Sequence, residues 1–471
     1  MCQVQYKSLS ELFEALQGIH QGAPCSTLFF ALFENELLKL VQQLRESIKM
    51  YDIDVSCPAF ADDVSLIATS KCTMQKMFKK PFEYACKWRF EFSPQKCKVL
   101  MFGKDENPKV KIRLGQCDVE ESKCETHLGV GLCTEKKAVT EFLSNKVSKC
   151  KSVLFSMKSI GSKRVPLLPV TGTKLYWSVC IPKLTYGFEI MDVVGPGLDV
   201  VEAFHCKAAK FIQGLPDQAV NIGSLITMGW KPLAFHIDFL RLMFMWRILL
   251  LPMSNIYKTI LIRRFLHLVY HYTGSRCGPA KNMLDLCIKY DLQNFVLYAI
   301  ENADYCSLRH WKKMVKYVIE ERYIRQVNVT KPLFKSLHYL TVGCYISPWW
   351  YNAHMFPSQS RQSRLIVQLL INKDRHVHTF CIHCDVQASV NTHHILFECT
   401  YLDRIRKDLW SRVEEVCPPV LVQHLNDMSS KERCSFILNG FYTRYTVEWQ
   451  DLYMSLSKFV FNMIKSFEGG T

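Results

Sequence analysis

The chain has 471 residues, of which 49% are hydrophobic and 22% are charged. This balance is that of an ordinary globular protein, and it excludes a disordered tail or a membrane protein as the overall class. The 59 lysines and arginines outnumber the 43 aspartates and glutamates, which gives a formal net charge of +16. Such an excess favours a polyanionic partner, because cations that neutralise phosphates release bound counterions. The alternative is a basic protein that binds no nucleic acid.

The most apolar stretch, Phe239 to Met253, is interrupted by Arg241 and Arg247. A membrane-spanning helix needs about 20 mostly apolar residues, so this stretch predicts a buried amphipathic helix. The first residues lack the basic flank, apolar run and small-residue site of a signal peptide. We therefore predict an intracellular protein, nuclear or cytoplasmic, without a membrane partner. Its 21 cysteines are expected to be reduced, with a subset bound to metal.

The first 135 residues mix helical and strand patterns. Apolar residues recur at helical spacing over Leu28–Leu44, and a second helix is expected around Met74–Trp88. Pro58–Ala68 (PAFADDVSLIA) predicts two short apolar strands that meet at an acidic bend. Val99–Phe102 predicts one more short strand.

Residues from about 136 to 370 are predicted to be mostly helical. Helices are expected over Ala138–Ile160, Gly172–Val179 and Leu198–Gln213, with prolines between them. Residues 371–471 contain a cluster of cysteines and histidines, then a charged helix and a final helical stretch. The sequence therefore predicts three regions, 1–135, 136–370 and 371–471.

Adjacent carboxylates at Asp62 and Asp63 stand where the two predicted strands meet, at one rim of a sheet. Polymerases need such carboxylates, because they hold the Mg²⁺ ions that activate a 3′-hydroxyl and neutralise the leaving pyrophosphate. The alternative is a solvated Asp-Asp turn, since this dipeptide is expected by chance about once in such a chain. The neighbouring motifs therefore decide the interpretation.

Three further motifs accompany the acidic Phe60–Asp63 segment (FADD) in chain order. Gly18–Thr27 (GIHQGAPCST) precedes it, and Phe92–Phe102 (FSPQKCKVLMF) and Thr126–Val130 (THLGV) follow it. Together they resemble the reverse transcriptase palm of non-LTR, LINE-type (jockey-like) retrotransposons. The chain departs from the family pattern at two positions. Thr27 stands where the family has proline, and Ser93 stands where it has asparagine.

The resemblance implies which residues contact substrate. These residues are Gln21, Gly22, Phe60, Ala61, Leu128 and Gly129. Gln21 is implied to sit beside the incoming nucleotide and the template. Gly22 has no Cβ, so its backbone can approach the substrate closely. The turn that contains Leu128 and Gly129 is implied to grip the primer strand.

The resemblance also implies the catalytic residues. Asp62 is the implied main Mg²⁺ ligand, with Asp63 as its neighbour. Lys96 is implied to offer a positive charge to the triphosphate or the leaving group, as a positioned cation can. The alternative for Lys96 is an ordinary surface lysine.

A third carboxylate is expected in family polymerases on an earlier strand, in a segment like A-F-D-x-V. Only 20 residues precede Gln21 here, and none of them shows that pattern. Two carboxylates at one turn cannot by themselves fix two Mg²⁺ ions about 4 Å apart. We therefore expect a C-terminal portion without the fingers and the first catalytic aspartate, which polymerises little or nothing alone.

A helical thumb is implied by three segments after the palm, Thr173–Trp177, Pro182–Gly187 and Val201–Lys207. They resemble the L-Y-x-S, P-x-L-x-Y-G and L-E-x-x-Q-x-K patterns of these elements. A positive face is predicted from Lys146, Lys149, Lys151, Lys158, Lys163 and Arg164. Such a face would contact phosphates of a template–primer duplex. The alternative is the ordinary solvated side of amphipathic helices.

The cysteines and histidines near the end have the pattern C-x2-C-x9-H-x4-C, formed by Cys381, Cys384, His394 and Cys399. A C-x2-C turn directs both sulfurs to one centre, and a later histidine and cysteine can complete a tetrahedron that Zn²⁺ favours. His393 competes with His394 as the ligand, and His383 is a spare. The alternative is a set of reduced, unligated thiols.

The same layout resembles the C-terminal zinc-binding segment of LINE-type elements, and its H-x4-C spacing favours His394 over His393. The basic and aromatic helix that follows in those elements is matched by Tyr401, Arg404, Arg406 and Trp410. All four ligand positions are filled by protein, so this zinc is interpreted as structural. A knuckle of this size has too little core to fold without its metal.

The predicted fold class is α+β: a partial reverse transcriptase palm, a mostly helical thumb and extension, and a small zinc-binding module. The predicted function is that of a non-LTR reverse transcriptase (RNA-directed DNA polymerase) portion, whose catalytic activity the sequence leaves uncertain. The implied cofactors are Mg²⁺ at an incomplete two-metal site and structural Zn²⁺. The implied partners are an RNA template and a DNA primer, with dNTP if the enzyme is active. The alternative is a non-catalytic nucleic-acid-binding protein derived from such an element.

Overall fold

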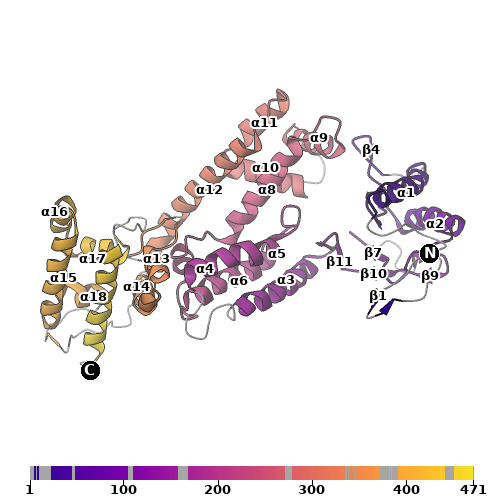
Figure 1. Cartoon of the computed structure of the whole chain (residues 1–471). Helices are drawn as coiled ribbons and strands as arrows, with labels where there is room; N and C mark the ends of the chain where they lie inside the picture. The colour runs from indigo at the N-terminus through magenta and orange to yellow at the C-terminus, as the bar shows by residue number, and fades with distance from the viewer. Residues whose placement is uncertain are drawn as a thin grey trace. The chain divides into compact units, whose positions relative to one another are not determined.

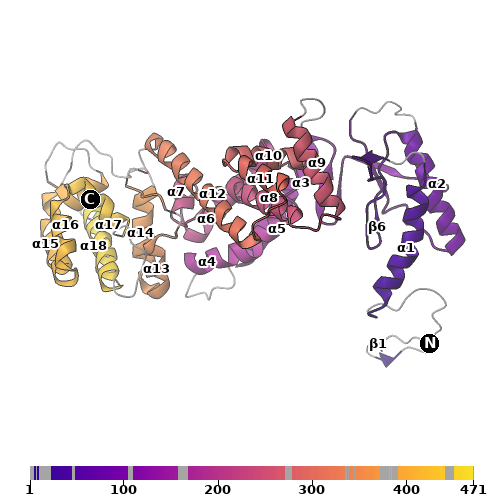
Figure 2. The ribbon, with the colours of Figure 1, turned by 90° about the horizontal axis from the view of Figure 1, so that it is seen from above.

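The computed structural model describes residues 5–6, 8–9, 23–44, 48–103, 110–157, 168–270, 278–334, 337, 339–343, 345–371, 381, 383–384, 391–440 and 450–469. The chain divides into two compact units. Unit 1 consists of Met1–Glu125, Leu132–Glu135 and Pro252–Leu266, and unit 2 consists of Thr126–Gly131, Lys136–Leu251 and His267–Thr471. Figure 1 and Figure 2 show the ribbon from two directions. Among the described residues, no helix has the length and apolar character needed to cross a membrane.

Unit 1 combines two helices with short strand pairs. The helices are α1 (Ser26–Gln42) and α2 (Lys71–Trp88). The strands are β1 (Gln5–Tyr6), β2 (Ser8–Leu9), β3 (Lys49–Met50), β4 (Ile53–Asp54), β5 (Ala59–Phe60), β6 (Asp63–Val64), β7 (Lys98–Leu100), β8 (Arg113–Leu114), β9 (Cys117–Asp118) and β10 (Glu120–Ser122). Both helices and the hairpin at the acidic pair agree with the sequence-based predictions, within a few residues at each end.

The strands of unit 1 form separate two-stranded ladders, with the described pairs β1–β2, β3–β4, β5–β6, β8–β9 and β7–β10. The first four pairs are antiparallel hairpins, because each connects its strands through a short loop. The β7–β10 pair is parallel, with Val99 opposite Glu121. A parallel pair needs a longer connection, which here contains the β8–β9 hairpin.

Two small apolar cores hold unit 1 together. In the first core, Val41 of α1 and Met77 of α2 are fully buried, and Val64 of β6 packs against them. Figure 2 shows β6 beside α1. In the second core, Val99 of β7 packs with Ile112 and its neighbours, and Met74 and Phe78 of α2 pack against them. The acidic hairpin is therefore anchored through its outgoing strand, while its loop is left at the surface.

Unit 2 is helical. Its helices are α3 (Lys136–Ser156), α4 (Pro169–Leu175), the π-helix η2 (Tyr176–Cys180), α5 (Ile181–Thr185), α6 (Pro196–Gln213), α7 (Asn221–Ile226), α8 (Leu233–Leu249), α10 (Pro279–Lys289), α11 (Gln293–Glu301), α12 (Leu308–Thr330), η3 (Lys331–Leu333), α13 (Pro348–Met355), η5 (Pro357–Gln359), α14 (Ser360–Ile371), the π-helix η6 (His394–Glu398), η7 (Thr400–Leu402), α15 (Asp403–Val416), α16 (Pro419–Asp427), α17 (Ser430–Leu438) and α18 (Gln450–Gly469). Helix α9 (Ile256–Tyr270) has residues in both units. A further hairpin, β11 (Cys124–His127) and β12 (Val130–Cys133), has its turn in unit 2.

The core of unit 2 is built around stacked aromatic rings. Trp246 of α8 stacks on Trp311 of α12 with ring centroids 4.2 Å apart, and both side chains are fully buried. The apolar stretch that begins at Phe239 lies in the mostly buried helix α8, as predicted, but the helix ends at Leu249. Met253 lies beyond it and is exposed. The turn after Leu249 takes the chain out of the core before the apolar stretch is complete.

Candidate functional site

The acidic pair lies on the β5–β6 hairpin. Phe60 pairs with Asp63 across the ladder, so Ala61 and Asp62 form the two-residue loop. Asp62 and Asp63 are both exposed, and so is Phe60, whose side chain is 66% exposed. The hairpin therefore offers its two carboxylates and one aromatic ring to solvent at a single tip.

Ala61 adopts a backbone conformation that side chains rarely take, with φ of +52°. Two-residue hairpin loops favour positive φ at their first position, and glycine is the residue that adopts it without cost. The β8–β9 hairpin illustrates this preference, because Gly115 occupies the same loop position with φ of +64°. The pairing of β5 with β6 thus forces Ala61 into a backbone conformation that favours glycine.

Glu34 of α1 is an acidic residue that feels the charge of the acidic pair. The pKa of its carboxyl group is raised, first by burial and then by the negative charge of Asp62. The sequence reasoning missed Glu34, because nothing local links α1 to the hairpin. Among the described residues, Asp62 and Asp63 do not join a third carboxylate, histidine or cysteine in a group able to hold a metal.

The remaining predicted polymerase residues of unit 1 are placed only in part. Gln21 and Gly22 lie outside the described residues. Lys96 is exposed in the turn after Ser93, where its backbone N–H donates to the Ser93 carbonyl oxygen at 3.1 Å. Among the described residues, no hydrogen bond or ion pair joins the Lys96 side chain to Asp62 or Asp63. An open groove of about 560 Å³ lies beside this turn, lined by Glu91, Phe92, Ser93, Pro94, Gln95 and Cys117.

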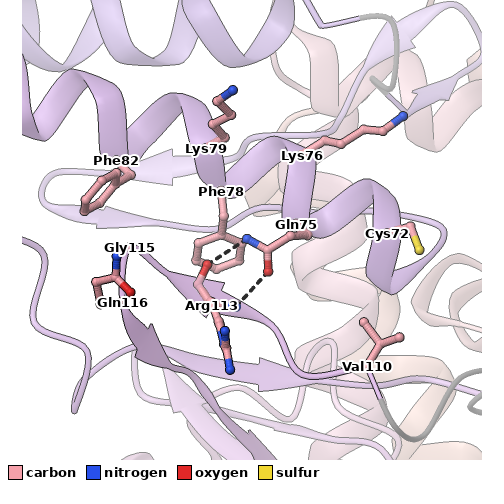
Figure 3. A pocket seen from close by; sticks show the side chains of 10 residues that line it. All are labelled: Cys72, Gln75, Lys76, Phe78, Lys79, Phe82, Val110, Arg113, Gly115 and Gln116. Carbon is pink, nitrogen blue, oxygen red and sulfur yellow. Dashed lines mark hydrogen bonds between the residues drawn. The ribbon is translucent and has the colours of Figure 1, made fainter.

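A second open groove, of about 570 Å³, lies between α2 and the β8–β9 hairpin (Figure 3). Gln75 lines this groove, and its amide exchanges hydrogen bonds of 2.9 and 2.8 Å with the backbone of Arg113. Arg113 also pairs with Asp118 at 2.9 Å, which neutralises part of its charge. None of the predicted site residues lines this groove, so it does not belong to the acidic site.

The predicted primer-contacting turn lies between β11 and β12. Leu128 and Gly129 have φ of +50° and +78°, the pattern of a type I′ hairpin loop. The Tyr186 hydroxyl donates to the Leu128 carbonyl oxygen at 3.1 Å, and Lys146 donates to the Tyr186 carbonyl oxygen at 2.7 Å. Tyr186 is thus a further residue that positions the turn, and the P-x-L-x-Y-G segment was the only sequence signal for it.

Substitutions in this turn are expected to change stability in opposite directions. Leu128→Asn should raise the free energy of unfolding by about 0.5–1 kcal/mol, because an Asn-Gly pair suits a type I′ loop. Gly129→Ala should lower it by about 1–2 kcal/mol, because an L-residue resists this positive φ. A Cβ added at Gly129 would also stand 2.9 Å from the Tyr186 ring. Thermal denaturation of the two variants measures both effects, and equal shifts for the two would contradict the assigned turn.

The prediction that the cysteines are reduced is wrong for two residues at the base of the same hairpin. Cys124 and Cys133 form a disulfide, with Cα atoms 4.1 Å apart, although the sequence predicted reduced thiols. The pairing of β11 with β12 brings these two residues opposite each other, which their spacing alone did not reveal. The remaining described cysteines form no disulfide.

The positive face predicted for α3 is less continuous than expected. Lys149 and Lys151 are exposed, but Lys146 is directed inward, where it lies 5.1 Å from the Phe188 ring centre. Burial lowers the pKa of Lys146, whose ammonium group donates to the Tyr186 carbonyl oxygen. Lys158, Lys163 and Arg164 lie outside the described residues.

The four predicted zinc ligands come together in unit 2. The ligand atoms of Cys381, Cys384, His394 and Cys399 all lie within 4.8 Å of one another. The sulfurs of Cys381 and Cys399 are 3.9 Å apart, and Cys384 Sγ is 3.6 Å from His394 Nε2. Tetrahedral zinc with Zn–S bonds of about 2.3 Å separates two sulfurs by roughly 3.8 Å. The donor types and their separations therefore fit a Cys₃His zinc site.

A π-helical turn explains how His394 and Cys399 reach the same centre. In an α-helix, residues five apart are rotated by about 140° from each other, on different faces. Here the backbone N–H of Cys399 donates to the His394 carbonyl oxygen at 2.8 Å, which is the i→i+5 bond of a π-helix. This wider turn places the two residues one above the other, so the H-x4-C spacing becomes a pair of neighbouring ligands.

The hydrogen-bond partners separate the competing histidines. His393 faces the Glu398 carboxylate at 3.1 Å and the Ser430 hydroxyl at 3.0 Å, so both of its ring nitrogens have partners away from the sulfurs. His383 contacts the Phe467 carbonyl oxygen at 3.0 Å. His394 directs Nε2 to the sulfurs, while its Nδ1 lies 3.4 Å from Glu398, within ion-pair range but without hydrogen-bond geometry.

Two residues outside the ligand set support the cluster. Glu398 lies behind His394, with its carboxylate 3.4 Å from Nδ1, on the side of the ring where zinc sites commonly have a carboxylate. Arg406 of α15 donates to the carbonyl oxygens of Leu396 and Cys399 at 3.0 and 2.9 Å, which fixes the chain next to the last ligand. The sequence predicted Arg406 in a basic helix but did not indicate that its side chain bonds to these two carbonyl oxygens. Trp410, from the same pattern, lies against the Arg433 guanidinium.

The thiols of the cluster differ in acidity. Burial raises the pKa of Cys399 to about 12. Burial also opposes ionisation of Cys381, but hydrogen bonds from the His383 and Cys384 backbone and from the His394 side chain lower its pKa to about 7. A thiolate is therefore stabilised next to a histidine in a mostly buried site. This is the charge state that Zn²⁺ requires of a cysteine ligand.

Comparison with known proteins gives one match. Residues 3–147 match the family model described as reverse transcriptase (RNA-dependent DNA polymerase). No curated protein and no solved structure matches the chain. The matched segment contains the acidic hairpin, Lys96 and the Leu128–Gly129 turn, and it ends within α3. The match supports a reverse transcriptase domain over residues 3–147.

Proposed function

We propose that this chain is part of a non-LTR, LINE-type retrotransposon reverse transcriptase and that it acts on an RNA template and a DNA primer. The observation that carries the proposal is the exposed acidic hairpin, which lies within the segment that matches the reverse transcriptase family. Its Asp62 and Asp63 are the proposed metal ligands. The subtype rests on the order of the four palm motifs and on the C-terminal Cys/His pattern.

The other proposed roles follow the positions of the motifs. Leu128 and Gly129 would contact the primer strand, because both residues of their type I′ loop are exposed. Lys96 would face the triphosphate of the incoming nucleotide, and its side chain is exposed. Gln21 and Gly22 are proposed on the resemblance alone.

The carboxylates present fit a single hydrated Mg²⁺ better than a pair of ions. Two adjacent exposed carboxylates can bind Mg²⁺ that keeps several waters. Two metals about 4 Å apart need a further ligand opposite this pair, and the described residues group no third carboxylate with it. Bound Mg²⁺ would neutralise phosphate charge at the hairpin tip. We therefore propose that this polypeptide by itself is not a competent polymerase.

A primer-extension assay tests that proposal. Purified chain with poly(A) template, oligo(dT) primer, dTTP and Mg²⁺ is expected to give little or no product above the level of an Asp62→Ala, Asp63→Ala variant. Template–primer binding by the same preparation, measured by fluorescence anisotropy, serves as the control for a folded protein. Clear synthesis by the original chain that disappears in the double variant would show that the site is complete.

We also propose that Cys381, Cys384, His394 and Cys399 bind one structural Zn²⁺. The support is the gathering of their ligand atoms within 4.8 Å and the carboxylate behind His394. Four protein ligands close the coordination sphere, so the metal would hold the surrounding helices rather than activate water. Elemental analysis of the purified chain should find one zinc per polypeptide.

A further inference from the structure

The first half of helix α12 carries a row of cations on its outer side. Arg309, Lys312, Lys313 and Lys316 are all exposed. Their spacing of i, i+3, i+4 and i+7 places them on one face of the helix. We call this surface, defined by those four residues, the α12 basic face.

Packing against α8 fixes which side of α12 is turned outward. The buried residues of α12 repeat every four positions, at Trp311, Val315, Ile319, Tyr323 and Val327. Trp311 stacks on Trp246 of α8, and its indole N–H donates to the Leu242 carbonyl oxygen at 3.0 Å. The α12 basic face lies on the side away from this seam, so its cations are held in one direction by a rigid core.

Among the described residues, no ion pair joins an acid to this face, although Glu320 follows Lys316 by four residues on the same side of the helix. The four cations of the face form no ion pair or hydrogen bond with a described residue, whereas Arg325, further along α12, pairs with Glu321 at 3.0 Å. The nearest acids that precede the helix are Asp304, which is exposed, and Glu301, which accepts a hydrogen bond from Tyr270. The positive charge of the face is therefore open to an external partner.

The position of Arg309 in the first turn of α12 is unfavourable for the helix. The N-terminal end of a helix carries partial positive charge, so nearby lysines and arginines are unfavourable there and acids are favoured. Helix α12 has no acid in its first turn, and its cap is the neutral Ser307 hydroxyl, which accepts from the His310 N–H. Like charges three and four residues apart add repulsion. A polyanion that binds this face would relieve both effects.

An exposed aromatic ring borders the cations. Tyr317 is 62% exposed and lies one turn beyond Lys313 on the same side of the helix. Its hydroxyl donates to Glu321 at 2.8 Å, which holds the ring along the helix surface. Cations beside an exposed aromatic ring are typical of surfaces that bind nucleic acid, because the ring can stack on a base or a sugar.

We propose that the α12 basic face binds the phosphate backbone of a nucleic acid. From Arg309 to Lys316 the helix rises by about 10 Å, which corresponds to roughly three phosphates along one strand. The contact would be independent of base sequence, since only phosphates and stacking are involved. The proposal rests on the proposed nucleic-acid function, and it adds a contact surface outside the segment that matches the reverse transcriptase family.

Two charge-matched double variants of the full chain test the proposal. Lys312→Gln, Lys316→Gln removes two cations from the α12 basic face. Arg322→Gln, Arg325→Gln removes the same charge from the other half of the helix, where Arg325 is already paired. Binding of a labelled RNA–DNA hybrid is measured by anisotropy over a series of salt concentrations.

The face variant is expected to bind about tenfold more weakly at low salt, and its salt slope should fall by about two units, one per lost phosphate contact. The control variant should keep the original slope. The melting temperature of the face variant should be unchanged or higher, because the two removed lysines are exposed and repel each other across one helical turn. Lower affinity together with a lower melting temperature would indicate damage to the fold and would count against the proposal.

The outcomes separate this proposal from the proposed function. If the original chain and the face variant bind the hybrid with equal affinity and equal salt slope, the α12 assignment is wrong. The reverse transcriptase assignment is then unaffected. Equal losses in both variants would mean that only net charge matters, which also overturns the assignment. No binding of the hybrid by the original chain at low salt would count against both.

Discussion

Removal of zinc should produce the largest loss of stability in this protein. A chelator such as EDTA, added to the full chain, is expected to lower the melting temperature of the C-terminal helices and to abolish their cooperative transition. Structural zinc contributes about 10–16 kcal/mol of binding free energy in small zinc modules, and here it would join Cys381 to Cys399 across eighteen residues. Circular dichroism with and without chelator measures the change, and added Zn²⁺ should restore the signal.

Matched variants make the zinc prediction specific. Cys399→Ser should lose bound zinc, whereas Cys417→Ser should keep it, because Cys417 is equally a buried thiol but lies outside the cluster. His394→Gln should also lose the metal, while His393→Gln should retain it, since His393 faces Glu398 and Ser430. Zinc content by elemental analysis distinguishes these cases. An original chain that contains no zinc, and whose melting is unaffected by chelator, would refute the site.

Replacing Trp311 should produce the second largest effect. Trp311→Ala is expected to reduce the free energy of unfolding of unit 2 by about 3–5 kcal/mol, because it empties a large, fully buried volume. The substitution also removes the ring that stacks 4.2 Å from Trp246 and leaves the Leu242 carbonyl oxygen without its indole donor. Urea denaturation followed by tryptophan fluorescence measures the loss.

Controls on the same helix separate packing from surface effects. Trp311→Phe keeps an aromatic ring but loses the N–H donor, so it should cost less than the alanine variant. Lys312→Gln, at the neighbouring exposed position, should change stability by less than about 0.5 kcal/mol. A Trp311→Ala variant as stable as the original chain would mean that α8 and α12 are not held by this stack. The α12 basic face would then lose the rigid support on which its direction depends.

Local sequence patterns predicted the acidic hairpin and the two helices of unit 1. Residues 58–68 were predicted as two strands around an acidic bend, and the structure has β5 and β6 there. Apolar spacing likewise predicted α1 and α2 within a few residues. These features depend on neighbouring residues, which one sequence displays directly. The parallel β7–β10 pair was not predicted, because it joins segments with a separate hairpin between them.

In the candidate sites, too, local spacing was predicted and contacts between distant segments were not. The C-x2-C-x9-H-x4-C spacing was sufficient to name four residues that the structure brings together. The spacing could not show that Glu398 stands behind His394, or that Arg406 fixes the carbonyl group of Cys399, because both depend on how η6 packs against α15. It also gave no sign that Lys146 is directed inward to Tyr186.

The order of the palm motifs, the acidic pair and the set of soft metal ligands can be read from the amino-acid sequence, because each is a short run whose residue types carry the chemistry. Which of these side chains face one another depends on the folded chain. The tertiary structure opened the π-turn that aligns His394 with Cys399, bonded Cys124 to Cys133, and turned the cations of α12 away from the Trp246–Trp311 seam. Those outcomes depend on burial and on pairing between distant segments, which are properties of the folded chain.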